Sequence, residues 1–159
     1  MQKITPCLWF NERVEEALNL YTTVFENAKV KDISYYPEDG PVTPGALMTA
    51  VFEIEGQEFM ILNGGPRNVF TEAVSFTVNC ETQEEVNHYW DSLTANGGQE
   101  VQCGWLKDPF GLSWQIIPTI LSKYITDKDP VKALNVFNAM SQMVKIDIAK
   151  IEEAYNREQ

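Results

Sequence analysis

Side chains that commonly carry out chemistry are scarce in this sequence. Among its 159 residues there is one histidine, His88, and there are three cysteines, Cys7, Cys80 and Cys103. An odd number of cysteines without any Cys-x-x-Cys spacing indicates neither a zinc site nor a disulfide framework. His88 lies off the apolar stripe of its predicted helix and should face solvent. The sequence therefore predicts structural thiols and a surface histidine rather than a nucleophile paired with a general base.

A polar strand face is the better candidate for a site. Ser75, Thr77 and Asn79 alternate with apolar residues, and Ser113 and Gln115 do the same on a later predicted strand. Because successive side chains of a strand point to opposite faces of its sheet, each polar set shares one face. A solvated sheet face and a ligand-binding face are equally consistent with this alternation.

The segment Asn63-Gly64-Gly65-Pro66-Arg67 has the glycines of a nucleotide-binding loop but not its pattern. It lacks the G-x-G-x-x-G spacing, and it follows a predicted strand without a helix after it. A dinucleotide or S-adenosylmethionine site of the Rossmann kind is therefore not supported.

Two predicted βαβββ modules position these candidates. The first contains a helix that Asn11 can cap and whose apolar stripe reaches Phe25. The second contains a helix that begins at Thr82, where Glu85 completes a capping box. The predicted strands are residues 3–10, 29–36, 46–55 and 57–62 in the first module, and 73–79, 100–103, 105–108 and 112–117 in the second.

The two modules have the pattern of an internal repeat. A shift of 69 residues carries Glu15 and Glu16 to Glu84 and Glu85. The same shift carries apolar helix positions onto one another, as it does Tyr21 onto Trp90. Two copies of a unit this long favour a pseudo-symmetric pair of modules over a solenoid. Chance similarity between two amphipathic helices is the alternative explanation.

After Pro118 the pattern changes, and the sequence predicts a linker followed by a helical tail. Asp129 can cap one helix, anchored by Leu134 and Phe137, and Asp147 can cap another. The predicted organisation is residues 1–128 as paired modules (about 1–66 and 67–117, then the linker), and residues 129–159 as a tail packed on the same domain.

Composition excludes several kinds of partner. With 44% hydrophobic residues the chain can bury one core, and its formal net charge of −11 disfavours nucleic acid and anionic membrane surfaces. The amino terminus lacks the pattern of a secretory signal, and no apolar run approaches bilayer length. We therefore expect a cytoplasmic protein that binds neither nucleic acid nor membrane.

Several strings along the chain resemble the vicinal oxygen chelate superfamily, the fold of glyoxalases, bleomycin-resistance proteins and extradiol dioxygenases. The repeated βαβββ unit, the helix segment at 17–21 and the Asp108-Pro109-Phe110-Gly111 turn carry this resemblance. Within the superfamily the chain is similar to the PhnB-like subgroup, often labelled 3-demethylubiquinone-9 3-methyltransferase. The strings similar to that subgroup are residues 4–10, 78–82, 103–108, 113–116 and 143–148.

This resemblance implies an α+β fold in which two βαβββ modules form an open, cup-shaped mixed sheet with a C-terminal helical extension. It also implies a homodimer, because members of the superfamily pair their modules across subunits. Activity is not fixed by the resemblance, since one fold hosts many functions.

The resemblance further implies where a divalent metal would be held, by side chains from the first and last strands of each module. Carried over, these positions are Ser75 and Gln115 in the second module. Back-shifting Ser75 by 69 residues gives Pro6 in the first module, and pairing residues 114–116 with residues 60–62 gives Ile61. A one-residue error in the shift would bring in a cysteine or a methionine instead. A hard cation needs several carboxylate or imidazole ligands, and this set offers a hydroxyl and a carboxamide. No metal and no other cofactor are therefore expected.

In the resembling fold the polar strand faces and several aromatic residues surround a concave site. The expected ligand-binding residues are Ser75, Thr77, Trp105, Phe110 and Gln115. An apolar wall with a few orienting polar groups suits a small organic molecule. The expected function is that of a metal-free binding protein of the bleomycin-resistance type. The alternative is an enzyme, either a metal-dependent isomerase or dioxygenase or the methyltransferase of the label.

Overall fold

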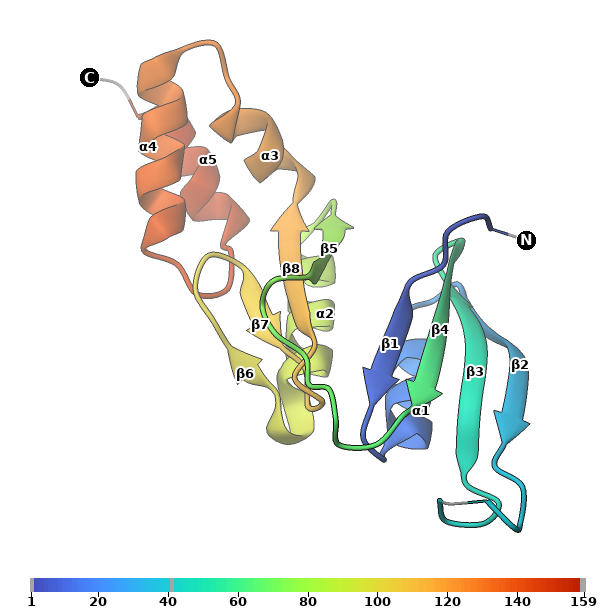
Figure 1. Ribbon diagram of the computed structural model, residues 1–159. Helices are drawn as coiled ribbons and strands as arrows, with labels where there is room; N and C mark the ends of the chain where they lie inside the picture. The colour runs from blue at the N-terminus through green and yellow to red at the C-terminus, as the bar shows by residue number, and fades with distance from the viewer. Residues whose placement is uncertain (1, 41, 158–159) are drawn as a thin grey trace. The chain divides into compact units, whose positions relative to one another are not determined.

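The computed structural model describes residues 2–40 and 42–157, and the chain divides into two compact units, residues 1–70 and 71–159. The first unit is a βαβββ module with a four-stranded mixed sheet in the order β1-β4-β3-β2 (Figure 1). Its first and last strands, β1 and β4, are parallel neighbours, whereas β3 pairs antiparallel with both β4 and β2. The elements are β1 (Cys7–Phe10), α1 (Val14–Val24), β2 (Ala28–Tyr35), β3 (Leu47–Ile54) and β4 (Gln57–Asn63).

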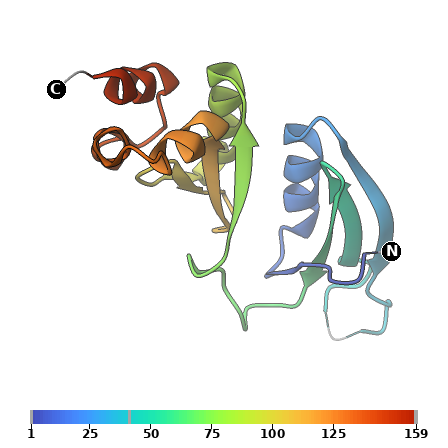
Figure 2. The ribbon, with the colours of Figure 1, turned by 90° about the horizontal axis from the view of Figure 1, so that it is seen from above.

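Helix α1 covers one face of this sheet (Figure 2). The apolar stripe predicted from the sequence is buried. Within this stripe, the aromatic ring of Tyr21 stacks against the ring of Phe52 in β3, with 6.1 Å between the ring centroids. The predicted cap is wrong: α1 begins at Val14, and its N-cap residue is Arg13, in the left-handed region with φ 53° and without a side-chain cap bond. The amide of Glu12 is instead bound by the Asn63 carboxamide oxygen, at 3.2 Å.

The second unit repeats the βαβββ module, with strand order β5-β8-β7-β6 and β5 parallel to β8. The predicted capping box is present in part, because the Thr82 hydroxyl accepts from the Glu85 amide at 3.2 Å, while the Glu85 carboxylate accepts from the Glu81 amide. The module consists of β5 (Ser75–Cys80), α2 (Gln83–Thr94), a short 3-10 turn (Ala95–Gly97), β6 (Gln99–Glu100), β7 (Trp105–Lys107) and β8 (Ser113–Pro118).

Three helices follow β8 within the second unit: α3 (Thr119–Ile125), α4 (Pro130–Ser141) and α5 (Ile148–Asn156). Part of the predicted linker is therefore helical, because Leu121 of α3 is buried with Val136, Ile146 and Ile151 in one apolar cluster. The predicted caps are confirmed: Asp129 accepts from the first amides of α4, and Asp147 from the Lys150 amide.

The predicted anchors of α4 are wrong. Leu134 and Phe137 are 57% and 49% exposed, whereas Val136 is fully buried. The stripe that packs inward is thus rotated from the one that the sequence suggested. The residues that Val136 packs against lie in α3, in α5 and just before α5, so the sequence of α4 alone does not indicate which of its faces is buried.

Hydrogen bonds join the tail to the second module. The Gln83 carboxamide of α2 donates to the Ile146 carbonyl at 3.1 Å and accepts from the Ile148 amide at 2.8 Å. The amide of Gly104, just before β7, donates to the Val144 carbonyl at 2.8 Å. In the described part of the chain no helix is both long and apolar enough to cross a bilayer.

Candidate functional site

The second sheet has one face covered by α2 and one open face. On the covered face Trp114, Ile116 and Leu106 are each at most 3% exposed. Among residues of opposite parity, Gln115 and Trp105 are only half-buried, whereas Ser113 is 1% exposed and Ile117 packs against the apolar cluster of the tail. The polar alternation that the sequence shows in β5 and β8 therefore lies on the open face.

Cross-strand register places four of the five predicted ligand-binding residues together on this face. Thr77 is opposite Gln115, and Gln115 is in turn opposite Trp105, so one row crosses three strands. Ser75 lies one row away, and its hydroxyl accepts a hydrogen bond from the Gln115 carboxamide at 2.9 Å. The arrangement puts hydroxyls, a carboxamide and an indole on one surface, which a small organic molecule could contact.

The next row holds a charged group. Ser75 is opposite Ser113, and Ser113 is opposite Lys107 of β7. Lys107 forms an ion pair with Glu72, which lies in the turn just before β5. This ion pair, which sequence alternation could not indicate, lowers the pKa of the Glu72 carboxyl, chiefly through the hydrogen bond from Lys107.

Phe110, the fifth predicted residue, lies in the turn between β7 and β8. The buried Asp108 carboxylate shapes this turn by accepting from the amides of Phe110 and Leu112 at 2.9 and 3.1 Å. Its other oxygen accepts from the Trp114 indole at 3.0 Å. Trp114 is 3% exposed and belongs to the core. The Asp-Pro-Phe-Gly string thus sets the geometry of the turn and locates Phe110 next to the Ser113 end of β8.

The counterpart of Gln115 in the first sheet differs from the expected Ile61. Ile61 is fully buried against α1, whereas its neighbour Met60 is half-buried on the open face, opposite the exposed Cys7. Pairing residues 114–116 with residues 60–62 therefore matched a position of the open face to a buried one. The 69-residue shift is also one residue off in the first strands, because residues 11–13 join β1 to α1 but only residues 81–82 join β5 to α2.

The glycines at 64–65 serve packing in the first unit. A Cβ atom on Gly64 would lie 2.3 Å from the Trp9 ring, and the Trp9 indole donates to the Gly65 carbonyl at 2.9 Å. The close contact at Gly64 and the left-handed backbone of Gly65, with φ 86°, explain why the segment has adjacent glycines without a nucleotide-binding pattern. This loop therefore fixes the position of the Trp9 indole.

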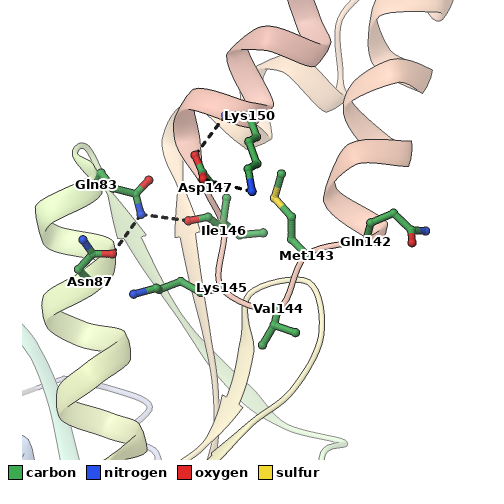
Figure 3. A pocket seen from close by; sticks show the side chains of 9 residues that line it. All are labelled: Gln83, Asn87, Gln142, Met143, Val144, Lys145, Ile146, Asp147 and Lys150. Carbon is green, nitrogen blue, oxygen red and sulfur yellow. Dashed lines mark hydrogen bonds and ion pairs between the residues drawn. The ribbon is translucent and has the colours of Figure 1, made fainter.

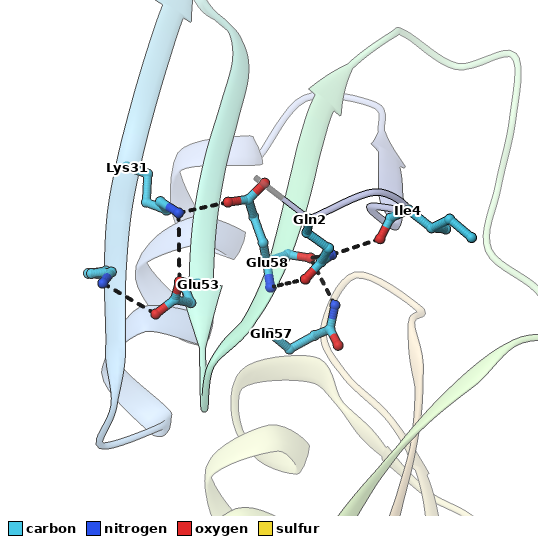
Figure 4. A network of polar contacts seen from close by, with 7 residues as sticks. Gln2, Ile4, Lys31, Glu53, Gln57 and Glu58 are labelled. Atoms are coloured by element: carbon cyan, nitrogen blue, oxygen red, sulfur yellow. Dashed lines mark hydrogen bonds and ion pairs between the residues drawn. The ribbon is translucent and has the colours of Figure 1, made fainter.

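The open face of the first sheet carries paired charges. Lys31 lies between Glu53 and Glu58, with nitrogen to oxygen distances of 3.7 and 2.7 Å (Figure 4). The backbone of Glu58 is also bound by the Gln2 carboxamide, which donates to its carbonyl and accepts from its amide. Carboxylates and ammonium groups satisfy one another here, so this face is less suited to an apolar ligand than that of the second sheet.

The histidine is exposed, as predicted, and among the thiols Cys80 is buried whereas Cys7 is exposed. Burial raises the pKa of the Cys80 thiol to about 12, and it also raises the pKa of Cys7, so neither is an activated nucleophile. His88 is exposed on α2, with its ring 5.0 Å from that of Tyr89. Cys103 is half-buried in the turn before β7.

The donor set on the open face of the second sheet does not fit a hard divalent cation. The positions that would carry ligands are occupied by hydroxyl and carboxamide groups, which are weak ligands without carboxylate or imidazole beside them. Among residues 2–40 and 42–157, no three side chains of His, Cys, Asp and Glu converge in a way that could hold a metal ion.

A pocket of about 540 Å³ lies where the tail meets α2 (Figure 3). Gln83 and Asn87 form one side, and the segment between α4 and α5 forms the other. Lys145 and Lys150 contribute ammonium groups, and their nearest carboxylates are 3.7 and 3.8 Å away. This pocket was not predictable from the sequence, because it depends on how the tail docks and no local pattern specifies that.

Comparison with known proteins agrees with this architecture. The family model of 3-demethylubiquinone-9 3-methyltransferase matches residues 2–117. A PhnB protein from Bacillus cereus is 36% identical, with a TM-score of 0.69, over 74% of this chain and 100% of the other.

More distant structures share the fold. PA1353 from Pseudomonas aeruginosa is 19% identical with a TM-score of 0.61, over 74% of this chain and 98% of its own. The fosfomycin resistance protein FosX from Listeria monocytogenes is 15% identical with a TM-score of 0.52, over 77% and 97% of the two chains. Among curated proteins, none matches this chain. From the module repeat, the strand order and the matched family model, we conclude that the chain belongs to the PhnB-like 3-demethylubiquinone-9 3-methyltransferase family, within the glyoxalase, bleomycin-resistance and vicinal oxygen chelate fold.

Proposed function

We propose that this chain binds a small organic molecule on the open face of its second sheet, without a metal. Ser75, Thr77 and Gln115 act as hydrogen-bonding groups, and Trp105 and Phe110 provide apolar contact. The observation that carries this proposal is the single row formed by Thr77, Gln115 and Trp105 across three adjacent strands. A few oriented polar groups beside an aromatic wall are typical of small-molecule sites.

The proposal extends to the assembly and location of the protein. We expect a homodimer, because members of the fold pair modules across subunits, and a cytoplasmic location, because the cysteines of the chain are free thiols, which suit a reducing compartment. The formal net charge of the chain is −11. The acidic surface makes nucleic acid and anionic membranes unsuitable partners.

The family's description names a different activity, methyl transfer to 3-demethylubiquinone-9. Two observations favour a binder. The glycines at 64–65 pack against Trp9, and the open face of the second sheet offers hydroxyls and a carboxamide. None of these groups has the basicity of a typical general base. An assay for a methylated quinone product separates the two functions, and catalytic turnover would replace our proposal.

Gln115→Leu tests the binding site. A screen of small aromatic compounds should find ligands that quench tryptophan fluorescence, since Trp105 is the cross-strand neighbour of Gln115. The substitution should weaken their binding by roughly 1 to 3 kcal/mol, because a polar group of the ligand would lose its partner.

Gln142→Leu is the matched control, because Gln142 is exposed in the tail and should leave affinity unchanged. Urea unfolding of both variants shows whether the fold is intact. If the Gln115 variant binds as tightly as the parent, the ligand lies elsewhere. If it fails to fold, Gln115 is a core residue and the assignment of the site is wrong.

A further inference from the structure

The ligand chemistry of the open face can be narrowed by the row of Ser75, Ser113 and Lys107. These residues are cross-strand neighbours on β5, β8 and β7. Each of the three side chains carries a hydrogen-bond donor, and that of Lys107 is also charged. The Gln115 nitrogen already donates to the Ser75 oxygen, which leaves the Ser75 hydroxyl proton available for a further acceptor.

Ser113 shows that this row is incomplete. The residue is 1% exposed, and its Oγ has no hydrogen-bond partner in the described part of the chain. Buried hydroxyl groups are normally bonded, and leaving one unbonded is unfavourable. It lies on the same face as Gln115, two residues along β8, so an acceptor bound beside Lys107 and Ser75 would be adjacent to it.

Glu72 already places an acceptor next to this row. Its carboxylate pairs with Lys107, while the Glu72 side chain is 61% exposed and the Lys107 side chain 32%. An exposed ion pair of this kind is weak and can be exchanged for another carboxylate. The Glu72 carboxylate therefore occupies the position beside Lys107 that the carboxylate of a ligand could take instead.

We infer that the ligand of this face carries a carboxylate or a similar acidic group, which displaces Glu72 from Lys107 and accepts from Ser113. The inference rests on the proposed function, because it assigns the chemistry of that same site. Its charge preference is local: the chain as a whole repels anions, whereas this row attracts them once the Glu72 carboxylate is displaced or neutralised. Glu72 is thus an internal competitor of the ligand.

An isosteric pair of probes tests the inference: 2-naphthoate, which is acidic, and 2-naphthamide, which is neutral. Affinities are measured by fluorescence titration for the parent protein, Glu72→Gln and Lys107→Met. Glu72→Gln should tighten 2-naphthoate about 2- to 5-fold, the range expected for removing an exposed competing ion pair. Lys107→Met should weaken 2-naphthoate by at least that factor, and both variants should leave 2-naphthamide unchanged.

Two controls account for the altered net charge. Glu152→Gln and Lys123→Met make the same changes at exposed positions of the tail, and neither should alter the affinity for 2-naphthoate. Ser113→Ala distinguishes a role of the Ser113 hydroxyl in binding from a role in stabilising the fold. It should weaken 2-naphthoate while leaving the free energy of unfolding equal or higher, because it removes an unbonded buried hydroxyl.

The outcomes separate this inference from the proposed function. If both probes bind with equal affinity and Glu72→Gln changes neither, the site is present and its preference for acids is refuted. If neither probe binds to any variant, both the proposed function and the inference fail. If Glu152→Gln tightens 2-naphthoate as much as Glu72→Gln does, the effect is one of net charge and the local competition is refuted.

Discussion

Gly64 is the residue whose identity the first unit constrains most directly. The Trp9 ring occupies the space of any Cβ at this position, with three ring atoms between 2.3 and 2.7 Å from where it would lie. No flexible side-chain end can yield there, because the contact is with an aromatic ring whose indole is also bonded to the Gly65 carbonyl.

Gly64→Ala should therefore destabilise the protein by about 1 to 3 kcal/mol, the usual cost of overpacking. Urea unfolding measures this change. In a Trp9→Leu background the same substitution should cost less, since the ring that it meets is gone. Equal costs in the two backgrounds would mean that Gly64 is required for a reason other than the Trp9 ring.

Part of the candidate site was predictable residue by residue. Strict alternation placed Ser75 with Thr77 on β5, and Ser113 with Gln115 on β8, and the register shows that both pairs lie on one face with Trp105. The ion pair of Lys107 with Glu72 was not predictable, because it depends on the path of a turn rather than on strand parity.

Among the elements, those with strong local signals were predicted well and those fixed by tertiary packing were not. Both modules, the Thr82 cap and the Asp129 cap follow from short-range chemistry, so the sequence specifies them. Helix α3 and the buried face of α4 depend on the cluster around Ile146, which gathers side chains distant in the chain. The Ile61 error has another origin, because pairing residues 114–116 with residues 60–62 matched the half-buried Gln115 to a fully buried residue.

The three tail helices meet at a polar contact around Tyr155. Its hydroxyl donates to the Asp127 carboxylate at 2.9 Å, and its ring stacks on Tyr124 at 3.7 Å between centroids. The bond from the Asp129 amide, followed by that from Tyr155, lowers the pKa of Asp127. The bond to Asp127 raises the pKa of Tyr155.

This contact predicts how tail stability depends on alkaline pH. Because the folded-state pKa of Tyr155 is raised, its contribution is fully present below the unfolded tyrosine pKa of about 10. It is lost as the pH rises through the folded-state value. The unfolding free energies of the parent and of Tyr155→Phe should therefore differ by a constant amount from about pH 7 to 9 and converge above about pH 10.

Paired urea titrations at each pH measure that difference, and other titrating groups cancel because both proteins share them. The phenylalanine retains an aromatic ring for stacking on Tyr124, so only the hydroxyl is tested. A difference that stays constant to about pH 11.5 would show that the Asp127 bond does not contribute to stability.

For the whole molecule, the repeat decides the fold. Each unit has its own four-stranded mixed sheet with the first strand parallel to the last, and the tail belongs to the second unit. The paired βαβββ modules were therefore predictable from a duplicated pattern, and the open mixed sheets from the family resemblance. The assembly of several chains was not, because it depends on surfaces whose partner lies outside one sequence.

We expect the purified protein to be a homodimer. Sedimentation equilibrium should then give about twice 18.1 kDa, independent of loading concentration well above the dissociation constant. Leu134→Lys replaces an exposed apolar side chain of α4. This substitution should improve solubility whether or not the exposed apolar side chains of α4 take part in the dimer. A mass of 18.1 kDa at every concentration would remove the homodimer from our proposal.

The parallel pairing of β1 with β4 and of β5 with β8 also constrains the order in which the chain can fold. Local hairpins such as β3 with β4 close short loops, but β1 can find its partner only after the whole first module has been synthesised. The first unit has all its strands once Asn63 has left the ribosome, whereas the second also awaits the tail that packs behind β8. During synthesis from the amino terminus, the first module can therefore complete its sheet early. The second module can complete its packing only after the last helix has been made.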